Sequence, residues 1–437
     1  MPPLACIDRV SRWIDTRMAE FFRRALVTAL AVGLLTPGVA LGVPKPSDLV
    51  DGATVAQRGI GVSALPDVTM KEGLLVDGDG RVLWSRNADQ QRAMASITKI
   101  MTAVVALERA DLNSLVTIPK VSTQVGESTS NLRTGERLPL QQVLEALLVK
   151  SGNDAAIAIT LHVSGSQGAF VKLMNEKAAQ LGMTHTHFAN PHGLDEPGHY
   201  TTASDLSVLA RYAMSKPEFR RIVGLKSVTI GSGAQKETLT STNVLLGNYL
   251  GANGIKTGFT NEAGYSVIES AQRDGVWLIA VVLGTSSELQ RFRDARDLLD
   301  WGFAHYRPQT LATSGTVVAQ ALVSDYLDVR VDAKVAKDVT IAVLDINGPI
   351  TRTVTVAPVK APVHVGEDIG AATFTQKGRL IASIPLVATS DVGRPNLFER
   401  VWIGLVRGWR AIFGSDAVSS TGIFGSIAGG LSAAVSY

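Results

Sequence analysis

Ser96 and Lys99 lie three positions apart at the start of an apolar run, residues 100–107, that predicts a buried helix. If this helix starts near Ser96, the two side chains share one face a turn apart, so the lysine amine can reach the serine hydroxyl. Serine is a weak nucleophile until a base takes its proton, and a lysine whose ammonium form is disfavoured by burial and by a nearby cation can be that base. The N–H groups and the dipole of the helix start would stabilise an anionic oxygen. The pair predicts acyl-transfer chemistry, although helix capping also produces this spacing.

A second polar group, Ser151 and Asn153 within residues 150–156, opens another apolar helix. Both residue types cap helices by accepting hydrogen bonds from exposed backbone N–H groups. The functional interpretation gives the site a second hydroxyl that passes protons and an amide that holds a substrate carbonyl.

A third stretch, residues 254–260, contains Lys256, Thr257 and Gly258 before two predicted strands. It could be an edge strand with a solvated lysine. Alternatively, the cation and the hydroxyl bind a carboxylate, and the glycine lets substrate lie close to the backbone. Lys256 would then also lower the pKa of Lys99.

The elements around these motifs predict an α/β domain. Residues 73–76 and 82–84 form a hairpin around an Asp-Gly-Asp-Gly turn, and strands return at 265–268 and 276–282 before a helix over 288–306. The residues between are mainly helical. We therefore expect one antiparallel sheet, closed by strands from both ends of the domain, with a helical lobe beside it.

The remaining chain divides into three regions. Residues 309–393 alternate Val, Thr and Ala with polar residues, which predicts a small all-β domain. Residues 394–437 begin with an amphipathic helix that we expect to lie in a membrane surface, the alternative being packing inside the protein. Its apolar stripe comprises Phe398, Val401, Trp402, Leu405, Val406, Trp409, Ile412 and Phe413, with Arg400, Arg407 and Arg410 opposite.

The N-terminal residues 1–42 have the features of an export signal. Arg23 and Arg24 precede a short apolar segment, and small residues follow it over 39–42. We expect the mature protein to begin near Val43, outside the cytoplasm, and a start at Met18 would give a signal of normal length. Residues 43–65, rich in Pro, Gly, Ser and Ala, are expected to be a leader into the first domain.

Composition excludes several classes of function. The formal net charge is +3 and there is no long basic run, so nucleic acid is not an expected partner. A single cysteine, Cys6, excludes an internal disulfide and a multi-thiolate metal site. Four histidines, at 185, 187, 192 and 199, lack helical metal-ligand spacing, so we expect no metal. We find no phosphate loop or dinucleotide fingerprint and expect no cofactor.

Ser-x-x-Lys, Ser-x-Asn and Lys-Thr-Gly, in this order, form the motif set of class A β-lactamases and penicillin-binding proteins. Residues 95–102, 151–156, 188–195 and 254–264 further resemble the serine-type D-alanyl-D-alanine carboxypeptidases, the low-molecular-mass penicillin-binding proteins. The resemblance is close over 66–306 and continues more loosely through the β domain. It implies a β-lactamase/transpeptidase-like catalytic domain over 66–308.

The resemblance also implies a mechanism. Ser96 would attack the penultimate carbonyl of a peptidoglycan stem peptide, D-alanine would leave, and water would release the acyl-enzyme. Lys99 would be the base and Ser151 the proton relay. The N–H groups of Ser96 and Phe259 would form the oxyanion hole.

Substrate binding is implied in the same way. Asn153 would be an amide clamp, and Lys256 and Thr257 would hold the terminal carboxylate, next to Gly258 and Phe259. Some relatives carry a histidine or another polar residue where Phe259 stands. β-Lactam antibiotics would acylate the enzyme, which would work on the periplasmic side of the cytoplasmic membrane.

Three other functions remain open on this sequence. A β-lactamase of this scaffold deacylates with a glutamate that an asparagine follows, whereas here Asn190 precedes Glu196. A DD-endopeptidase would use the same nucleophile. A cell-wall or penicillin-binding structural factor would not need Lys99.

Overall fold

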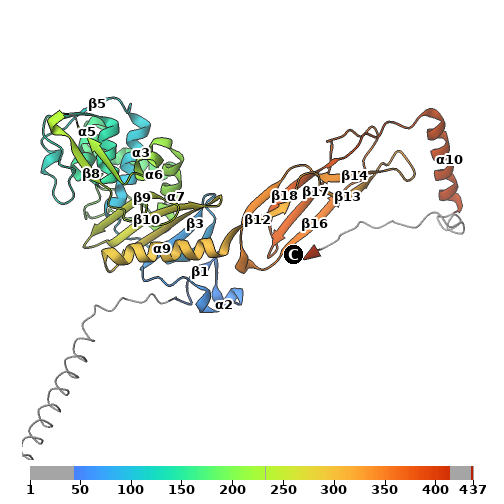
Figure 1. The fold of residues 1–437 in the computed structure, drawn as a ribbon, viewed down its shortest axis with the longest axis horizontal. Coiled ribbons are helices and arrows are strands. Elements are labelled where there is room, and N and C mark those ends of the chain that lie inside the picture. Colours follow the sequence, from blue (N-terminus) through green and yellow to red (C-terminus); the bar gives the residue numbers. More distant parts are fainter. Residues whose placement is uncertain (1–43, 232, 414–434, 437) are drawn as a thin grey trace, which may run out of the picture.

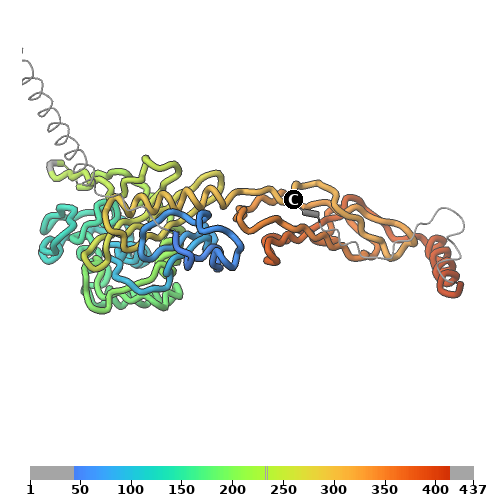
Figure 2. The backbone as a smooth tube through the Cα atoms, turned by 90° about the horizontal axis from the view of Figure 1, so that it is seen from below, coloured from blue at the N-terminus to red at the C-terminus, as the bar shows by residue number. Residues whose placement is uncertain are grey.

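The computed structural model describes residues 44–231, 233–413 and 435–436. A domain of helices and sheet lies at one end of this part of the chain, an all-β domain follows it, and helix α10 (Leu397–Phe413) lies beyond (Figure 1). A view turned by 90° shows the same end-to-end arrangement (Figure 2). The predicted export signal, residues 1–42, lies outside the described residues.

The first domain is organised around an antiparallel seven-stranded sheet in the order β2-β1-β4-β3-β11-β10-β9. Strand β3, from the start of the domain, pairs with β11, from its end, which confirms the predicted closure by both ends. The predicted hairpin is β3 and β4, where Asp77 Oδ1 accepts the N–H groups of Asp79 and Arg81. The strands are β1 (Leu49–Val50), β2 (Ala53–Thr54), β3 (Glu72–Asp77), β4 (Val82–Arg86), β9 (Ala252–Thr260), β10 (Gly264–Arg273) and β11 (Val276–Thr285).

Alternate strand residues pack against two different layers. Leu74 and Val76 join the core beneath the helical lobe, whereas Leu75 joins the core beneath α9 (Glu288–His305), on the other face of the sheet (Figure 1). The lobe contains α3 (Lys99–Arg109), α4 (Leu140–Val149), α5 (Asn153–Ser164), α6 (Gln167–Gln180), α7 (Ala203–Ser215) and α8 (Pro217–Val223). Two two-stranded antiparallel sheets complete it: β5 (Leu115–Thr117) with β6 (Arg137–Pro139), and β7 (Ser227–Ile230) with β8 (Glu237–Thr240).

Residues 44–65, expected to be a leader, carry more structure than their composition indicates. They add β1 and β2 to the sheet, followed by the short helix α2 (Val55–Arg58), which Thr54 opens with a capping box. Val50, Val55 and Leu65 are buried under the sheet. Backbone pairing and three buried apolar side chains hold this segment in place. So few apolar residues form no hydrophobic periodicity, and the sequence therefore did not predict this structure.

The second domain is all β, as predicted. Its larger sheet has the order β13-β14-β18-β17-β16-β19, and β12 pairs with β15 beside it. Val331, Phe374 and Leu386 are among its core residues. The strands are β12 (Tyr306–Ala312), β13 (Val317–Leu322), β14 (Arg330–Val335), β15 (Val339–Leu344), β16 (Ile350–Val356), β17 (Asp368–Gln376), β18 (Arg379–Ala388) and β19 (Val435–Ser436).

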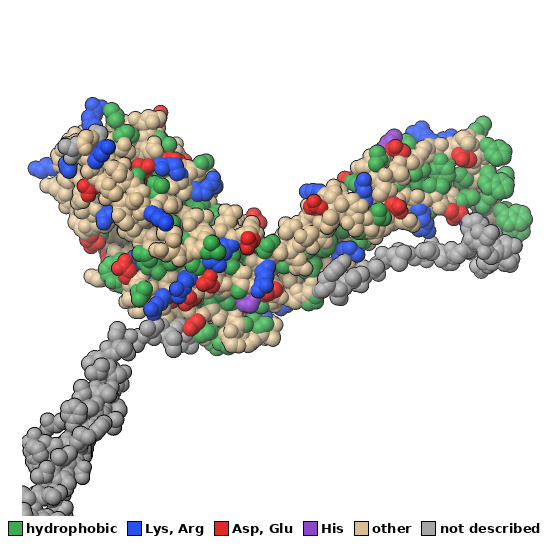
Figure 3. Space-filling view, in the orientation of Figure 1, with side chains coloured by type: hydrophobic (Ala, Val, Ile, Leu, Met, Phe, Trp, Pro, Cys, Tyr) green, Lys and Arg blue, Asp and Glu red, His purple; other side chains and the backbone are tan. Residues whose placement is uncertain are grey.

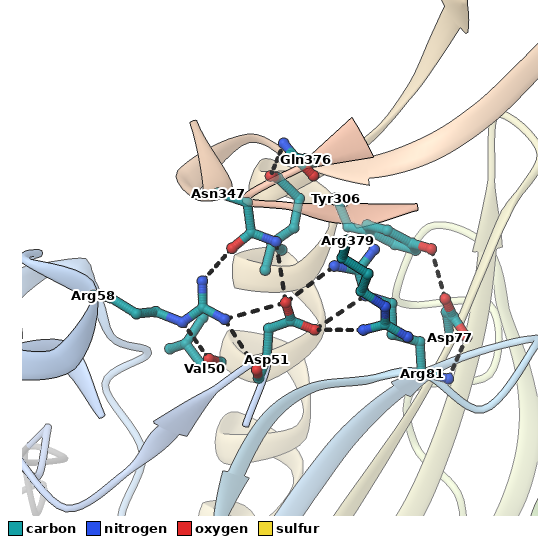
Figure 4. A network of polar contacts seen from close by, with 10 residues as sticks. Val50, Asp51, Arg58, Asp77, Arg81, Tyr306, Asn347, Gln376 and Arg379 are labelled. Carbon is teal, nitrogen blue, oxygen red and sulfur yellow. Dashed lines mark hydrogen bonds and ion pairs between the residues drawn. The ribbon is translucent and has the colours of Figure 1, made fainter. Parts of the chain in front are cut away.

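A polar network joins the two domains (Figure 4). Asp51 forms ion pairs with Arg58 and Arg81 and accepts a hydrogen bond from Asn347 Nδ2, in the β domain. Arg58 in turn donates to Asn347 Oδ1. Arg379 of β18 approaches Asp51 to 3.6 Å. The segment before β3 thus connects the sheet to the β domain.

Helix α10 packs against the β domain on one side only. Ile403 is buried and Arg407 donates to the carbonyls of Ser324 and Tyr326. Most of the predicted apolar stripe is exposed and gathers at the end of the molecule (Figure 3): Phe398, Val401, Trp402, Leu405, Trp409, Ile412 and Phe413. Among the described residues, no helix has the length and apolar character needed to cross a membrane.

Candidate active site

Ser96 lies in a 3₁₀ turn, Ala95–Thr98, and the α-helix α3 begins at Lys99, three residues later than predicted. Side chains at i and i+3 of a 3₁₀ turn are nearly eclipsed, which brings the two side chains together. Lys99 Nζ lies 2.8 Å from Ser96 Oγ. The predicted pairing of amine and hydroxyl is therefore present.

The other contacts of Lys99 define its protonation state. The amine is fully buried, and burial lowers the pKa of Lys99 to about 7, against the attraction of Asp154 and Glu127. Nζ also lies 2.7 Å from Asn153 Oδ1 and 2.7 Å from the His192 carbonyl oxygen.

Both of these oxygens can only accept hydrogen bonds. Asn153 Nδ2 donates to the Gly126 carbonyl, which fixes Oδ1 as the atom that faces the amine. A neutral Lys99 therefore gives its two N–H groups to these oxygens and directs its lone pair at the Ser96 hydroxyl. This is the arrangement that a general base for Ser96 needs.

Ser151 sits in a left-handed conformation, with φ of 67°, just before α5. It does not cap that helix, since Gly152 is the N-cap and no side chain caps there. Its Oγ instead accepts from Lys256 Nζ at 2.8 Å. Within the described residues Ser151 has no hydrogen bond to Ser96 or Lys99, so a proton relay between them requires a substrate atom.

Lys256 belongs to β9, the edge strand of the sheet, but it is buried rather than solvated. Its Nζ also donates to the Thr257 carbonyl at 2.9 Å. Burial, with repulsion from Lys99 and Arg291, holds the pKa of Lys256 well below its ordinary value. The neighbouring Thr257 hydroxyl lies 2.7 Å from that of Thr242. Lys256 and Thr257 thus lie on the strand that packs against the turn of Ser96.

Two glycines allow the strand and a loop to approach the nucleophile. A Cβ at Gly258 would lie 3.2 Å from Ala95 Cβ, so this glycine lets β9 lie against the 3₁₀ turn, a packing role beside the predicted substrate approach. A Cβ at Gly193 would lie 2.0 Å from the Ala95 carbonyl oxygen. Phe259 is 43% exposed, and its ring lies 4.2 Å from that of Tyr265.

His199 supports the turn that carries Ser96, and sequence reasoning missed this role. The Ala189 N–H donates to His199 Nδ1, so Nε2 carries the proton and donates to Thr98 Oγ1 at 2.7 Å. Thr98 Oγ1 donates in turn to the Ala95 carbonyl. Burial, with repulsion from His187, lowers the pKa of His199 to about 4, which keeps this neutral form at physiological pH.

Arg291 of α9 also reaches the site, donating to the Gly258 carbonyl. No local pattern indicates it, because it approaches from a different layer of the fold. In the described part of the chain, no group of three or more His, Cys, Asp or Glu residues is placed to hold a metal ion.

Two models of known protein families match this chain. Residues 60–287 match the family model described as D-alanyl-D-alanine carboxypeptidase, peptidase S11. Residues 306–394 match the penicillin-binding protein 5 C-terminal domain.

Individual relatives agree over most of the chain. D-alanyl-D-alanine carboxypeptidase DacC of Escherichia coli is 32% identical, over 80% of this chain and 91% of its own length. The crystal structure of DacD from Francisella tularensis has a TM-score of 0.59 and 26% identity, covering 75% of this chain and 95% of that one. A Streptomyces DD-transpeptidase variant has a TM-score of 0.54 and 32% identity, covering 55% of this chain and 100% of that one.

Proposed function

The chain belongs to the family of serine-type D-alanyl-D-alanine carboxypeptidases, and on this premise we propose that Ser96 is its catalytic nucleophile. The substrate is a peptidoglycan stem peptide that ends in D-alanyl-D-alanine. The observation that carries the proposal is the fully buried Lys99 amine, 2.8 Å from Ser96 Oγ and with a pKa of about 7.

In the first step the neutral Lys99 amine takes the Ser96 proton, and Oγ bonds to the penultimate carbonyl carbon. The backbone N–H groups of Ser96 and Phe259 hold the resulting oxyanion. The bond to the terminal D-alanine nitrogen then breaks, and this nitrogen receives the proton that Lys99 took from Ser96, passed on by the Ser151 hydroxyl that Lys256 holds in place. Water, deprotonated by Lys99, hydrolyses the acyl-enzyme and restores the Ser96 hydroxyl.

Substrate binding uses the groups around the nucleophile. Lys256 and Thr257 hold the terminal carboxylate, and the Asn153 amide, itself fixed by Lys99 and Gly126, holds a substrate carbonyl. Strand β9 is an edge strand, so an extended peptide can pair alongside it. A β-lactam carries an equivalent carboxylate and a reactive carbonyl, and it acylates Ser96.

The test measures D-alanine release from a pentapeptide ending in D-Ala-D-Ala, together with labelling by a fluorescent penicillin, for wild type and Ser96→Ala. We expect the variant to lose both. Release retained by Ser96→Ala would refute the assignment of the nucleophile. Labelling of the wild type without release would favour an endopeptidase or a structural factor.

A transpeptidase alternative follows from the similarity to the Streptomyces enzyme. An acyl-enzyme on Ser96 can pass to an amine instead of to water. Adding glycine or D-alanine amide as acceptor, and comparing hydrolysis with aminolysis product, separates the two outcomes.

We further propose that the protein is exported and that α10 anchors it to the outer surface of the cytoplasmic membrane. The support is the exposed apolar face of α10 at the end of the molecule opposite the first domain (Figures 1 and 3). The β domain lies between α10 and the site, so it holds the site away from the bilayer, toward a polymeric substrate.

A further inference from the structure

Glu269 is a fully buried carboxyl group that the mechanism does not use. It lies on β10, one strand in from the edge strand that carries Lys256 and Thr257, and its register partner is Ile255. Its Oε2 accepts from Asn243 Nδ2 at 2.8 Å, whereas Oε1 is buried without a hydrogen-bond partner in the described part of the chain. An unsatisfied buried oxygen is destabilising, and such exceptions tend to occur at functional sites.

The partner of Glu269 leads directly to the site. Asn243 Oδ1 accepts the Leu245 N–H at 3.0 Å, and the backbone N–H of Asn243 donates to Ser241 Oγ, so the side chain and the backbone of Asn243 together hold residues 241–245. Within this loop, the Thr242 hydroxyl lies 2.7 Å from the Thr257 hydroxyl.

One hydroxyl hydrogen lies between Thr242 and Thr257, which leaves the other for a ligand oxygen. The position of Thr242 therefore sets the direction of the donor that remains. A loop that shifted by a few tenths of an ångström would misdirect this donor without disturbing Ser96 or Lys99.

We propose that Glu269 is a positioning residue for the carboxylate site: through Asn243 it fixes Thr242 beside Thr257, and so selects substrates with a free terminal carboxylate. This inference rests on the proposed role of Lys256 and Thr257 in binding that carboxylate. Burial raises the pKa of Glu269 well above its ordinary value, which favours the neutral form, and a neutral carboxyl group does not repel the substrate. Glutamine is then a near-equivalent replacement.

The experiment compares kcat/KM for one peptide that ends in D-Ala-D-Ala as the free acid and as the C-terminal amide. The ratio of the two values isolates recognition of the carboxylate, because a general structural defect lowers both values together. Glu269→Met keeps the volume of the side chain but removes the partner of Asn243. Glu269→Gln keeps the partner, and Val244→Ala is the matched control, an exposed side chain in the same loop.

We expect Glu269→Met to lower the acid-to-amide ratio about fivefold, the size of effect that one misaligned hydrogen bond produces, mainly through KM of the free acid. Glu269→Gln and Val244→Ala should keep the wild-type ratio. An unchanged ratio in Glu269→Met, or an equal loss on both substrates, would overturn the proposal. A wild type without preference for the free acid would instead refute the carboxylate role of Lys256 and Thr257.

A second pair of variants keeps the proposal testable if Glu269→Met does not fold. Thr242→Val should lower the ratio to a similar degree, and Thr242→Ser should restore it. Where Glu269→Met does fold, adding it to Thr242→Val should have no further effect on the ratio, since both changes break one chain of contacts. Full additivity would contradict the proposed connection.

Discussion

Proteins usually expose lysines and bury large apolar side chains, and the active site and helix α10 depart from this rule in opposite directions. At the site, two lysines are buried, Lys99 at 0% and Lys256 at 1% exposure. At the far end of the molecule, Phe398 and Ile412 of α10 are 83% and 76% exposed (Figure 3). Lysines are almost never fully buried, and apolar side chains gathered in one exposed patch are uncommon on soluble proteins.

Each exception has a different kind of compensation. The buried amines are compensated within the fold, by hydrogen-bond acceptors and by the neutral form of Lys99. The apolar face of α10 has no such partner among the described residues, so its compensation must come from outside them. A buried lysine thus indicates chemistry, and an exposed apolar stripe indicates binding. The following changes test this contrast.

Lys99→Met is expected to have the largest effect. We expect kcat/KM to fall about 10³-fold or more, because the general base for Ser96 is lost. The free energy of unfolding should fall by no more than about 1 kcal/mol, since the lost hydrogen bonds are offset by removing a poorly solvated amine. Peptide hydrolysis and urea unfolding measure the two quantities.

Met101→Leu, a neighbouring core change in α3, is the matched control and should leave both quantities nearly unchanged. A Lys99→Met protein that unfolds readily would mean that the buried lysine is structural. One that keeps its activity would assign the base to another group.

The complementary change is Trp402→Ser with Trp409→Ser on α10. Removing two large apolar side chains should weaken partition into phospholipid vesicles about 10- to 100-fold, while hydrolysis of a soluble peptide changes less than about twofold. Co-sedimentation with vesicles measures the partition. Leu250→Ser, which removes an exposed apolar side chain from the first domain, should have no effect on the partition into vesicles. Unchanged sedimentation of the double variant would mean that the stripe has another partner.

The network around Asp51 joins the domain that contains the active site to the β domain against which α10 packs (Figure 4). Asp51→Asn removes the charge that pairs with Arg58 and Arg81, and we expect the free energy of unfolding to fall by about 1–2 kcal/mol. Arg379→Gln removes a partner that is 65% exposed and 3.6 Å away, so it should cost less than about 0.5 kcal/mol. Urea unfolding measures the free energy of unfolding of both variants. Equal losses would contradict the expectation that the more buried residue contributes more.

The fold follows from local patterns to a large extent. Short apolar runs in β3, β10 and β11, the Asp-Gly turns and the apolar stripes of the helices predict the sheet, and the motifs predict which residues meet at Ser96. The start of α3 was misplaced because a 3₁₀ turn and an α-helix share the same apolar spacing over a few residues.

The supporting contacts could not be predicted in this way. His199 and Thr98, Thr242 and Thr257, and Asn243 and Glu269 are each brought together by tertiary packing, and no spacing in the sequence connects them. Strands β1 and β2 were missed for a related reason: each is only two residues long, too short for an alternating pattern to show.

The smallest expected effect is a shift in the pH dependence of acylation by penicillin. Lys99 must be neutral to accept the Ser96 proton, so the rate should rise with pH and level off above its pKa of about 7. The attraction of Glu127 raises that pKa, and Glu127 is exposed, so Glu127→Gln should lower the apparent pKa by about 0.2–0.5 units. The rate below pH 7 should then increase up to about threefold, with the plateau unchanged.

Glu262→Gln, an exposed acid that does not contribute to the pKa of Lys99, is the control. An unchanged pH profile in Glu127→Gln would mean that the titrating group does not sense the charge of Glu127 and is therefore not the Lys99 amine.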